Sequence, residues 1–341
     1  MINNIYFEEF GENNPEIIIF LHNKMMSNWI FQKQKDFFKN FHCIFIDIPH
    51  HGKSQLNEPF SINNVTELLK DLIIDILTIK NKNIIDKEYN LNNDLNNDDN
   101  INNSDKYVEK LNIFNNNKNN DILNIFKDNS INNESKKNKV NLIGIDIGGQ
   151  IILNLIAIYP ELVNTAIVSG VNLKDNSNNE INTNLENKKI GYLLNALNQC
   201  KTDILDKKNE NFIVRGYLAE FGIEKKHFNE IKEAVNIIDQ NNLINITEES
   251  LKYKLPDKNN LKYNKFSSLL VLYGTKEYPK VKNSAKIIKM SFSNAKVYSV
   301  YRAIHLWNLI NYKWFNEIAI EYIENKKINI DNKQYLEKVD I

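Results

Sequence analysis

The stretch that decides the fold is GIDIGG, Gly144 to Gly149, which lies between an apolar run and a helix-like segment. The residues before it, Val140 to Ile145, form an apolar run (VNLIGI) typical of a strand buried on both faces. The residues after it, 148–158 (GGQIILNLIAI), predict a helix that ends at Tyr159-Pro160. Asp146 therefore stands on a sharp strand-to-helix turn, where we expect a positive φ, which Asp tolerates better than most residues.

The same alternation of strand and helix patterns continues on both sides of this turn. Repeated strand–helix units predict the α/β class, with a mostly parallel, doubly wound sheet covered by helices on both faces. The further strands are expected at 17–21, 43–48, 166–169, 268–273 and 296–301, and the further helices at 29–39, 64–80, 281–290 and 308–324.

Two segments do not follow this alternation of strand and helix patterns. Residues 81–137 are dominated by Asn, Asp and Lys, so we expect a disordered, low-complexity insertion in a surface loop. Residues 173–262 show mainly helical patterns and are interpreted as a helical cap inserted between two strands of the sheet. The core is then assembled from 1–80, 138–172 and 263–326, and 327–341 is a C-terminal tail.

The composition excludes several classes of protein. Lys plus Arg and Asp plus Glu both number 43, so the zero net charge argues against a nucleic-acid binder. No uninterrupted apolar window reaches about 18 residues, so no membrane span is expected. The N-terminus MINNIYFEEF does not resemble a signal peptide, and the two cysteines, Cys43 and Cys200, are interpreted as buried free thiols rather than a disulfide. We therefore expect a cytoplasmic protein.

Three candidate catalytic residues follow predicted strands. They are Asp146, Glu277 and His305, in that order along the chain. Open parallel sheets bind ligands at the carboxyl ends of their strands, so we expect these side chains to converge. No Cys/His group has metal-ligand spacing, and neither G-x-G-x-x-G nor G-x-x-x-x-G-K-[ST] occurs, so no metal, nucleotide or other cofactor is expected.

Several stretches together resemble one known family. GIDIGG has the outline of the nucleophile elbow G-x-S-x-G, with Asp in place of Ser. Residues 17–29 (IIIFLHNKMMSNW) look like a strand followed by an oxyanion loop, and residues 44–54 (IFIDIPHHGKS) look like the motif D-x-P-G-H-G-x-S. VLYGTKEY and YRAIHLWNLINYKWF look like an acid loop and a histidine loop. In this order they resemble the α/β-hydrolase superfamily, of the esterase and epoxide-hydrolase type.

The resemblance implies roles for individual residues. Asp146 would stand at the nucleophile position, His305 would be the base, and Glu277, with Asp175 as the fallback, would be the acid. The backbone N–H groups of Lys24 and Ile147 would form the oxyanion hole. Asn23 replaces the usual Gly, and we expect it to keep the turn because Asn tolerates positive φ.

Further residues would line the substrate site or lie near it. The expected substrate-binding residues are Asn23, Trp29 and the cap tyrosines Tyr192 and Tyr217, which could protonate the oxygen of an opening epoxide. Ile147 replaces the Trp that haloalkane dehalogenases use to hold halide, which disfavours that branch. His22 is expected to have a structural role beneath the oxyanion loop, while His50 and His51 are expected on a surface turn.

The chemistry at Asp146 stays open at this level. An ionised carboxylate can attack an sp³ carbon of an epoxide or alkyl halide, after which His305 and Glu277 would activate water to hydrolyse the alkyl ester. Alternatively, the His305–Glu277 pair activates water alone, or Asp146 marks the loss of covalent catalysis and serves only as a helix N-cap. The expectation is a hydrolase acting on a small or lipid-like uncharged substrate. The alternative is a catalytically inactive protein, a pseudoenzyme, that binds a small ligand or a partner that the sequence does not identify.

Overall fold

The computed structural model describes residues 5–56, 58–95, 139–174, 223–238, 240–256, 266–331 and 333–339. Within α2, side chains are described as far as residue 82. Most of the expected insertion and the first half of the expected cap lie outside the described residues. The same is true of Asp175, Tyr192, Cys200 and Tyr217.

The centre of the molecule is an eight-stranded sheet with the order β1-β3-β2-β4-β5-β6-β7-β8. The six inner strands pair in parallel, as predicted, whereas β1 and β8 pair antiparallel at the two edges. Neither edge strand was expected from the sequence, because each is short and mostly exposed on its outer residues. The strands are β1 Phe7–Phe10, β2 Ile17–Leu21, β3 His42–Ile46, β4 Val140–Ile145, β5 Val163–Ser169, β6 Leu269–Gly274, β7 Lys296–Val300 and β8 Leu336–Lys338.

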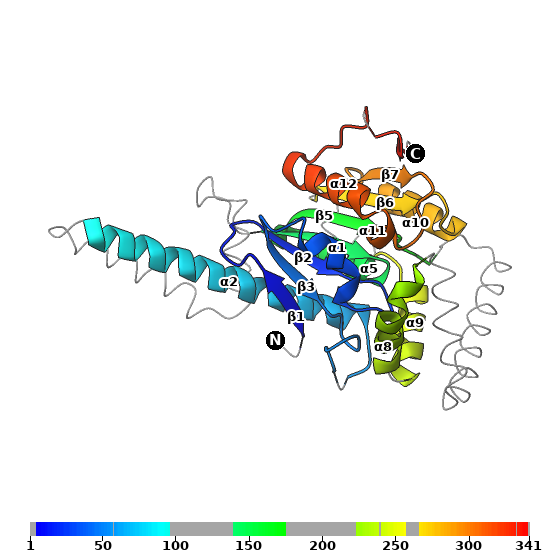
Figure 1. Ribbon diagram of the computed structural model, residues 1–341, viewed down its shortest axis with the longest axis horizontal. Helices are drawn as coiled ribbons and strands as arrows, with labels where there is room; N and C mark the ends of the chain where they lie inside the picture. The colour runs from blue at the N-terminus through cyan, green and yellow to red at the C-terminus, as the bar shows by residue number, and fades with distance from the viewer. Residues whose placement is uncertain are drawn as a thin grey trace.

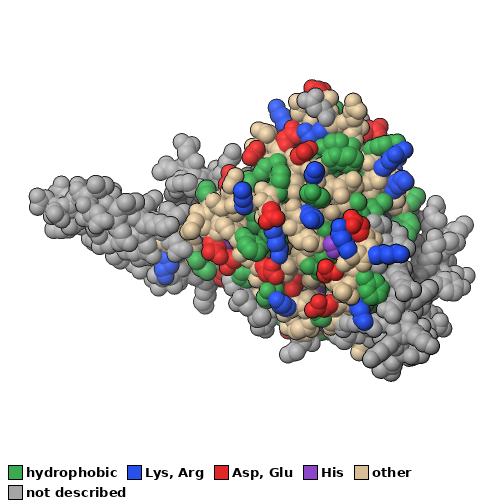
Figure 2. All heavy atoms as spheres, viewed as in Figure 1, with side chains coloured by type: hydrophobic (Ala, Val, Ile, Leu, Met, Phe, Trp, Pro, Cys, Tyr) green, Lys and Arg blue, Asp and Glu red, His purple; other side chains and the backbone are tan. Residues whose placement is uncertain are grey.

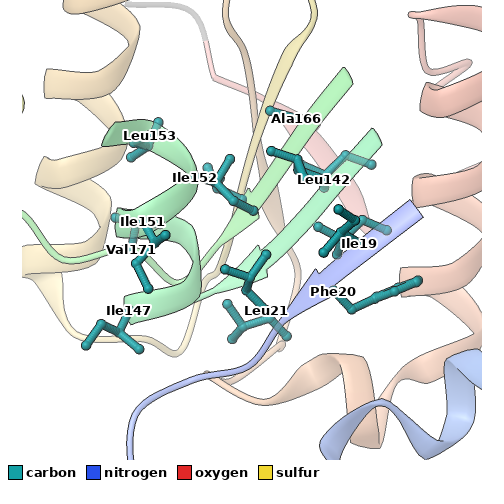
Figure 3. Close-up of a cluster of buried hydrophobic side chains, with 14 of the residues drawn as sticks. Ile19, Phe20, Leu21, Leu142, Ile147, Ile151, Ile152, Leu153, Ala166 and Val171 are labelled. Atoms are coloured by element: carbon teal, nitrogen blue, oxygen red, sulfur yellow. The ribbon is translucent and has the colours of Figure 1, made fainter. Parts of the chain in front are cut away.

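Helices cover the two faces of this sheet (Figures 1 and 3). One layer includes α5 and α2, which pack on each other, and the other includes η1, α1, α11 and α12. The helices are η1 Asn28–Phe31, α1 Gln32–Lys35, α2 Ile62–Leu95, α5 Ile147–Ile158, η2 Pro160–Leu162, η3 Lys225–His227, α8 Phe228–Ile237, α9 Gln240–Lys252, α10 Pro279–Ser291, α11 Trp307–Ile310 and α12 Tyr312–Asn325.

Three expected boundaries are wrong. The helix expected at 29–39 is a short 3₁₀ turn followed by α1, which ends at Lys35 because the chain then turns to bury Phe38 and Phe41. Helix α2 continues past residue 80 to Leu95 and projects beyond the sheet (Figure 1), since no Gly or Pro interrupts residues 81–95. The expected C-terminal tail contributes β8 to the sheet.

The apolar face of α5 anchors the turn at Asp146. Ile147, Ile151 and Ile152 are fully buried, and Figure 3 shows Ile152 on the side of the strands and Ile151 beside Val171. This density of branched apolar side chains explains why the helix that follows the turn is held rigidly against the strands. On the surface, Lys and Arg are intermixed with Asp and Glu over the face in Figure 2, in keeping with the zero net charge.

Helix α9 is attached to the core by polar contacts. The side-chain amide of Gln150 in α5 donates to the carbonyl oxygens of Asn172 and Ser250, at 2.6 and 2.9 Å. Asn245 donates to the carbonyl oxygen of Phe60, and Glu249 accepts from the N–H of Ile62 at the start of α2. The described part of the expected cap therefore rests on the helices next to the Asp146 turn.

Candidate active site

Asp146 forms the turn between β4 and α5. Its backbone has φ 52° and ψ −112°, the positive φ predicted from the sequence. The Asp146 N–H donates to the carbonyl oxygen of Ser169 at 2.9 Å, and its own carbonyl accepts from Gln150 at 3.0 Å. Such a conformation costs a non-glycine residue of order 1–3 kcal/mol, so the surrounding contacts must impose it.

Glycine next to the turn brings the neighbouring loop close. A Cβ added at Gly148 would lie 2.3 Å from the carbonyl oxygen of Leu21 and 2.7 Å from that of His22. The start of α5 thus lies directly against the end of β2, and the loop after β2 reaches the Asp146 side chain.

The Asp146 carboxylate forms an ion pair with Lys24. The Lys24 ammonium donates to Oδ2 at 2.9 Å and to Oδ1 at 3.2 Å, and the Lys24 backbone N–H lies 3.4 Å from Oδ2. The Asp146 side chain is only 1% exposed, whereas that of Lys24 is 24% exposed. Lys24 therefore contacts the carboxylate with both its side chain and its backbone, and its ammonium lies toward the solvent side.

This environment keeps Asp146 ionised. Burial alone would raise the pKa of the Asp146 carboxyl, but the charges of Lys24 and His305 and the hydrogen bonds from Lys24 outweigh burial and hold the pKa below its usual value. Asp146 occupies the N-cap position of α5, as the alternative interpretation expected, but its carboxylate makes no side-chain cap hydrogen bond to the helix.

His305 and Glu277 form a second pair. Glu277 Oε1 lies 2.7 Å from His305 Nδ1, and Glu277 Oε2 accepts from the Gly274 N–H at 2.6 Å. The side chains of Glu277 and His305 are 2% and 12% exposed. The carboxylate thus holds the ring through Nδ1.

The pair lies at the end of β5 as well. Gly170 has φ 65°, and a Cβ added there would lie 2.8 Å from His305 Nδ1 and 2.9 Å from Glu277 Oε1. Only a residue without a side chain fits this position. The close approach was not expected from the sequence.

Asp146 and His305 influence each other electrostatically. Burial would lower the pKa of His305, but the hydrogen bond and charge of Glu277, together with the charge of Asp146, outweigh it and raise the pKa above its usual value. Lys24 opposes this increase. The structure therefore brings together Asp146, Glu277, His305 and Lys24, from loops that follow β4, β6, β7 and β2.

The loop after β2 differs in detail from the expectation. The positive φ expected at Asn23 is found instead at Met25, with φ 64°. Asn23 is buried, its side-chain amide donates to the carbonyl oxygen of Lys24, and its carbonyl accepts from His22 Nδ1 at 2.7 Å. Because these contacts fix Asn23, the chain reverses two residues later.

The remaining histidines have structural roles. His22 Nε2 accepts the N–H of Ile48 at 2.9 Å, which ties the loop after β2 to the loop after β3. His50 and His51 are buried rather than on a surface turn, and His50 adopts φ 65°, which explains why the related motif has Gly there. Burial lowers the pKa of His22 to about 4 and that of His51 to about 3, so both stay neutral near pH 7.

Trp29 lies on the cap side of the core. Its ring packs against His227 at the start of α8, with 5.6 Å between the ring centroids. No described contact joins it to Asp146, so its expected role in substrate binding stays a prediction. Ile147 follows Asp146 directly and is fully buried, and its N–H belongs to the first turn of α5, where N–H groups have no intrahelical partner.

Two further expectations concern metals and membranes. In the described part of the chain, no group of three or more His, Cys, Asp or Glu side chains could hold a metal ion. A helix able to cross a membrane is also absent from the described residues, although α2 has 34 residues. Cys43 is a buried free thiol whose pKa is raised to about 12 by burial.

The comparisons with known proteins identify the fold. No protein-family model matches the chain, and no curated protein matches it. Solved structures are similar at low sequence identity. An esterase from Exiguobacterium antarcticum is 14% identical with a TM-score of 0.60, over 94% of this chain and 96% of that one. An epoxide hydrolase from Bacillus megaterium, solved with an inhibitor, is 15% identical with a TM-score of 0.59, over 94% and 97%. An α/β hydrolase from a Medee basin deep-sea metagenome library is 17% identical with a TM-score of 0.58, over 96% of each chain.

The chain has the α/β-hydrolase fold. The contact of the Lys24 ammonium with Asp146, like the close approach of Gly170, was not expected from the sequence, which pointed only to the Lys24 backbone N–H. A partner of this kind could have been predicted from the sequence, because a buried carboxylate needs a cation or several hydrogen-bond donors. Lys24 is the charged residue of the loop expected beside Asp146.

Proposed function

We propose that the protein is a hydrolase whose nucleophile is the Asp146 carboxylate and whose substrate is a small or lipid-like uncharged electrophile, such as an epoxide. The observation that carries the proposal is a buried, ionised carboxylate on a strained turn, which interacts electrostatically with the histidine of the His305–Glu277 pair. A group with a perturbed pKa that lies next to an oriented histidine is typical of a catalytic site. No cofactor takes part in this chemistry.

In the first step, an Asp146 oxygen attacks an sp³ carbon of the epoxide. A carbon–oxygen bond forms to the enzyme, the ring carbon–oxygen bond breaks, and the released alkoxide takes a proton from water. A carboxylate suits this reaction because it is already ionised near neutral pH. Attack on an ordinary ester would instead give a reactive mixed anhydride, which is why we assign an alkylating substrate.

In the second step, His305 Nε2 takes a proton from a water molecule, whose oxygen adds to the carbonyl carbon of the Asp146 ester. The bond between that carbon and the alkoxy oxygen then breaks, and the diol leaves with a proton from His305. The Asp146 carboxyl gives its remaining proton to the hydroxide formed in the first step, which restores the carboxylate. Glu277 holds the ring and stabilises its positive charge, as the acid does in related triads. We assign the support of the oxyanion to the backbone N–H of Lys24, which lies 3.4 Å from Asp146 Oδ2, and to the N–H of Ile147.

Trapping of the ester tests the proposal. The His305→Gln protein is incubated with styrene oxide, 1,2-epoxyoctane and 1-bromobutane and analysed by intact-mass and peptide mass spectrometry. We expect a one-to-one adduct on Asp146, because the ester forms but its hydrolysis loses the base. Asp146→Asn should abolish turnover, and the double variant Asp146→Asn/His305→Gln is the matched control that must stay unmodified.

The second candidate function is a catalytically silent protein that binds a small ligand. The Lys24 ion pair favours it, since a carboxylate bound by an ammonium through both oxygens is a weaker nucleophile. In that case wild-type protein turns over none of the probes and the His305→Gln protein gains no mass. That result would reject the hydrolase in favour of the silent protein.

A further inference from the structure

The Lys24 side chain lies against the carboxylate that reacts in the proposed hydrolysis. Its ammonium contacts both oxygens of Asp146, so it touches whichever oxygen attacks and whichever oxygen remains as the ester carbonyl. These are the reacting atoms of both steps. The lysine side chain is partly exposed while the carboxylate is buried, and the charge of Lys24 is one of the two that lower the pKa of Asp146.

The strength of this contact changes during the reaction. The free enzyme pairs Lys24 with a full carboxylate charge. Alkylation removes that charge, because the ester is neutral, and attack by water restores a negative charge on the same carbonyl oxygen. The Lys24 contact is therefore strong in the free enzyme, weak in the ester and strong again in the tetrahedral intermediate. Such a contact disfavours alkylation and accelerates ester hydrolysis.

Alkylation of Asp146 also changes the charges around His305, in a way that favours ester hydrolysis. In the free enzyme, Asp146 and Glu277 raise the pKa of His305 and Lys24 lowers it. Once Asp146 is an ester, its negative charge is gone while that of Lys24 remains, so the ring loses its proton more readily. His305 is then converted to the neutral base in the state that needs one.

We propose that the Lys24 ammonium is a catalytic group of the second step, stabilising the oxyanion that forms on Asp146 when its alkyl ester is hydrolysed. This inference rests on the proposed function, since it requires the ester. The oxyanion is then stabilised by a side chain as well as by backbone N–H groups.

Single-turnover kinetics of Lys24→Met test the assignment. The probe is the member of the epoxide and bromide panel that labels the His305→Gln protein, and adduct formation and decay are followed by rapid quench and mass spectrometry. We expect alkylation no slower than in wild type and ester hydrolysis about 10²–10³-fold slower, the usual effect of removing an oxyanion donor. The Asp146 ester should then accumulate in Lys24→Met although His305 is intact.

Three comparisons make the result decisive. Lys24→Arg keeps the positive charge and should restore much of the rate of ester hydrolysis. Lys24→Gln removes the charge but keeps a hydrogen-bond donor. Lys39→Met removes an exposed lysine elsewhere and should match wild type. Thermal melting separates a folding defect from a kinetic one, and Lys24→Gln replaces Lys24→Met if the latter is unfolded. The role of Lys24 is overturned if Lys24→Met and Lys24→Gln both hydrolyse the ester at the wild-type rate, or if both are alkylated more slowly than wild type. In either case, an adduct in His305→Gln still supports the proposed function. An unlabelled His305→Gln protein overturns both.

Discussion

The histidines of this chain occupy opposite electrostatic environments. At His22 and His51, burial dominates and lowers the pKa to about 4 and about 3. At His305, burial is outweighed by Glu277 and Asp146, and the pKa is raised. The side chains that face His305 thus reverse the effect of burial, which is what a ring that must gain and lose a proton requires.

A titration by NMR tests this difference. We expect the Cε1–H resonance of His305 to titrate with a midpoint above about 6.5, the ordinary value, and the midpoint to fall in Glu277→Gln because the hydrogen-bonded charge is removed. His22 and His51 serve as internal controls and should not titrate between about pH 5 and 9. A wild-type midpoint at or below the ordinary value would contradict the assignment.

The sign of the linked stability follows from the raised pKa. Protonated His305 stabilises the folded state fully below the unfolded pKa of about 6.5, and this stabilisation is lost as the pH rises through the higher folded pKa. Glu277→Gln should therefore weaken the pH dependence of unfolding in that window. In the Asp146 ester the charge that helps to raise the pKa of His305 is gone, so ester hydrolysis should become faster over a pH window below the one in which this stabilisation disappears.

The conformation of a single residue could be predicted where the local turn requires it. The positive φ at Asp146 follows from the strand–helix turn and its flanking glycines. The reversal at Met25 rather than Asn23 was not predictable, because it depends on the hydrogen bonds of His22 and Asn23 with their own loop. The Lys24 ion pair likewise depends on the close packing of α5 against β2, which no pattern within either segment encodes.

At the scale of elements, Gln150 couples the helix behind the turn to α9. Its amide donates to the carbonyl oxygens of Asn172, after β5, and of Ser250, in α9. All three residues are buried or half-buried, so the two carbonyl groups have no ready access to water. The position of α9, in the segment expected to be a cap, is therefore linked to the element that holds Asp146.

Removal of this link should loosen α9 selectively. Gln150→Ala leaves the carbonyls of Asn172 and Ser250 without their donor, and we expect the free energy of unfolding to fall by about 1–3 kcal/mol. Hydrogen exchange should increase in α9 while α12 stays as protected as in wild type. Gln55→Ala, which removes an exposed glutamine, is the matched control. Unchanged exchange in α9 would show that its other contacts hold it without Gln150.

Element prediction succeeded where burial leaves a continuous pattern. The inner strands and α5 are buried along their whole length, so their apolar runs identify them. The edge strands β1 and β8 failed this criterion because half or more of their residues are exposed or partly exposed. The end of α2 was placed too early because Asn-rich composition was interpreted as loop, although no residue there breaks a helix.

For the whole molecule, the parallel sheet is what brings remote segments together. Lys24, Asp146, Glu277 and His305 follow β2, β4, β6 and β7, whose carboxyl ends share one edge of the sheet. Strand β2 pairs with β3 on one side and with β4 on the other, so the pairing of Ile18 with Asn141 joins segments on opposite sides of the Asn-rich insertion. The contacts described at the site are made by residues outside that segment.

This organisation predicts that the insertion contributes little to stability. Replacing 96–136 with Gly-Ser repeats of the same length should change the melting temperature by no more than about 3 °C, because Asn, Asp and Lys dominate the segment and bury little apolar surface. The same length avoids any change in loop closure, which would add its own entropy. Calorimetry measures the shift, and trapping of the Asp146 ester in the replaced protein, with His305→Gln, reports on the site. A melting temperature lower by more than about 5 °C would mean that the segment packs on the core, and that the sheet does not by itself assemble the four loops.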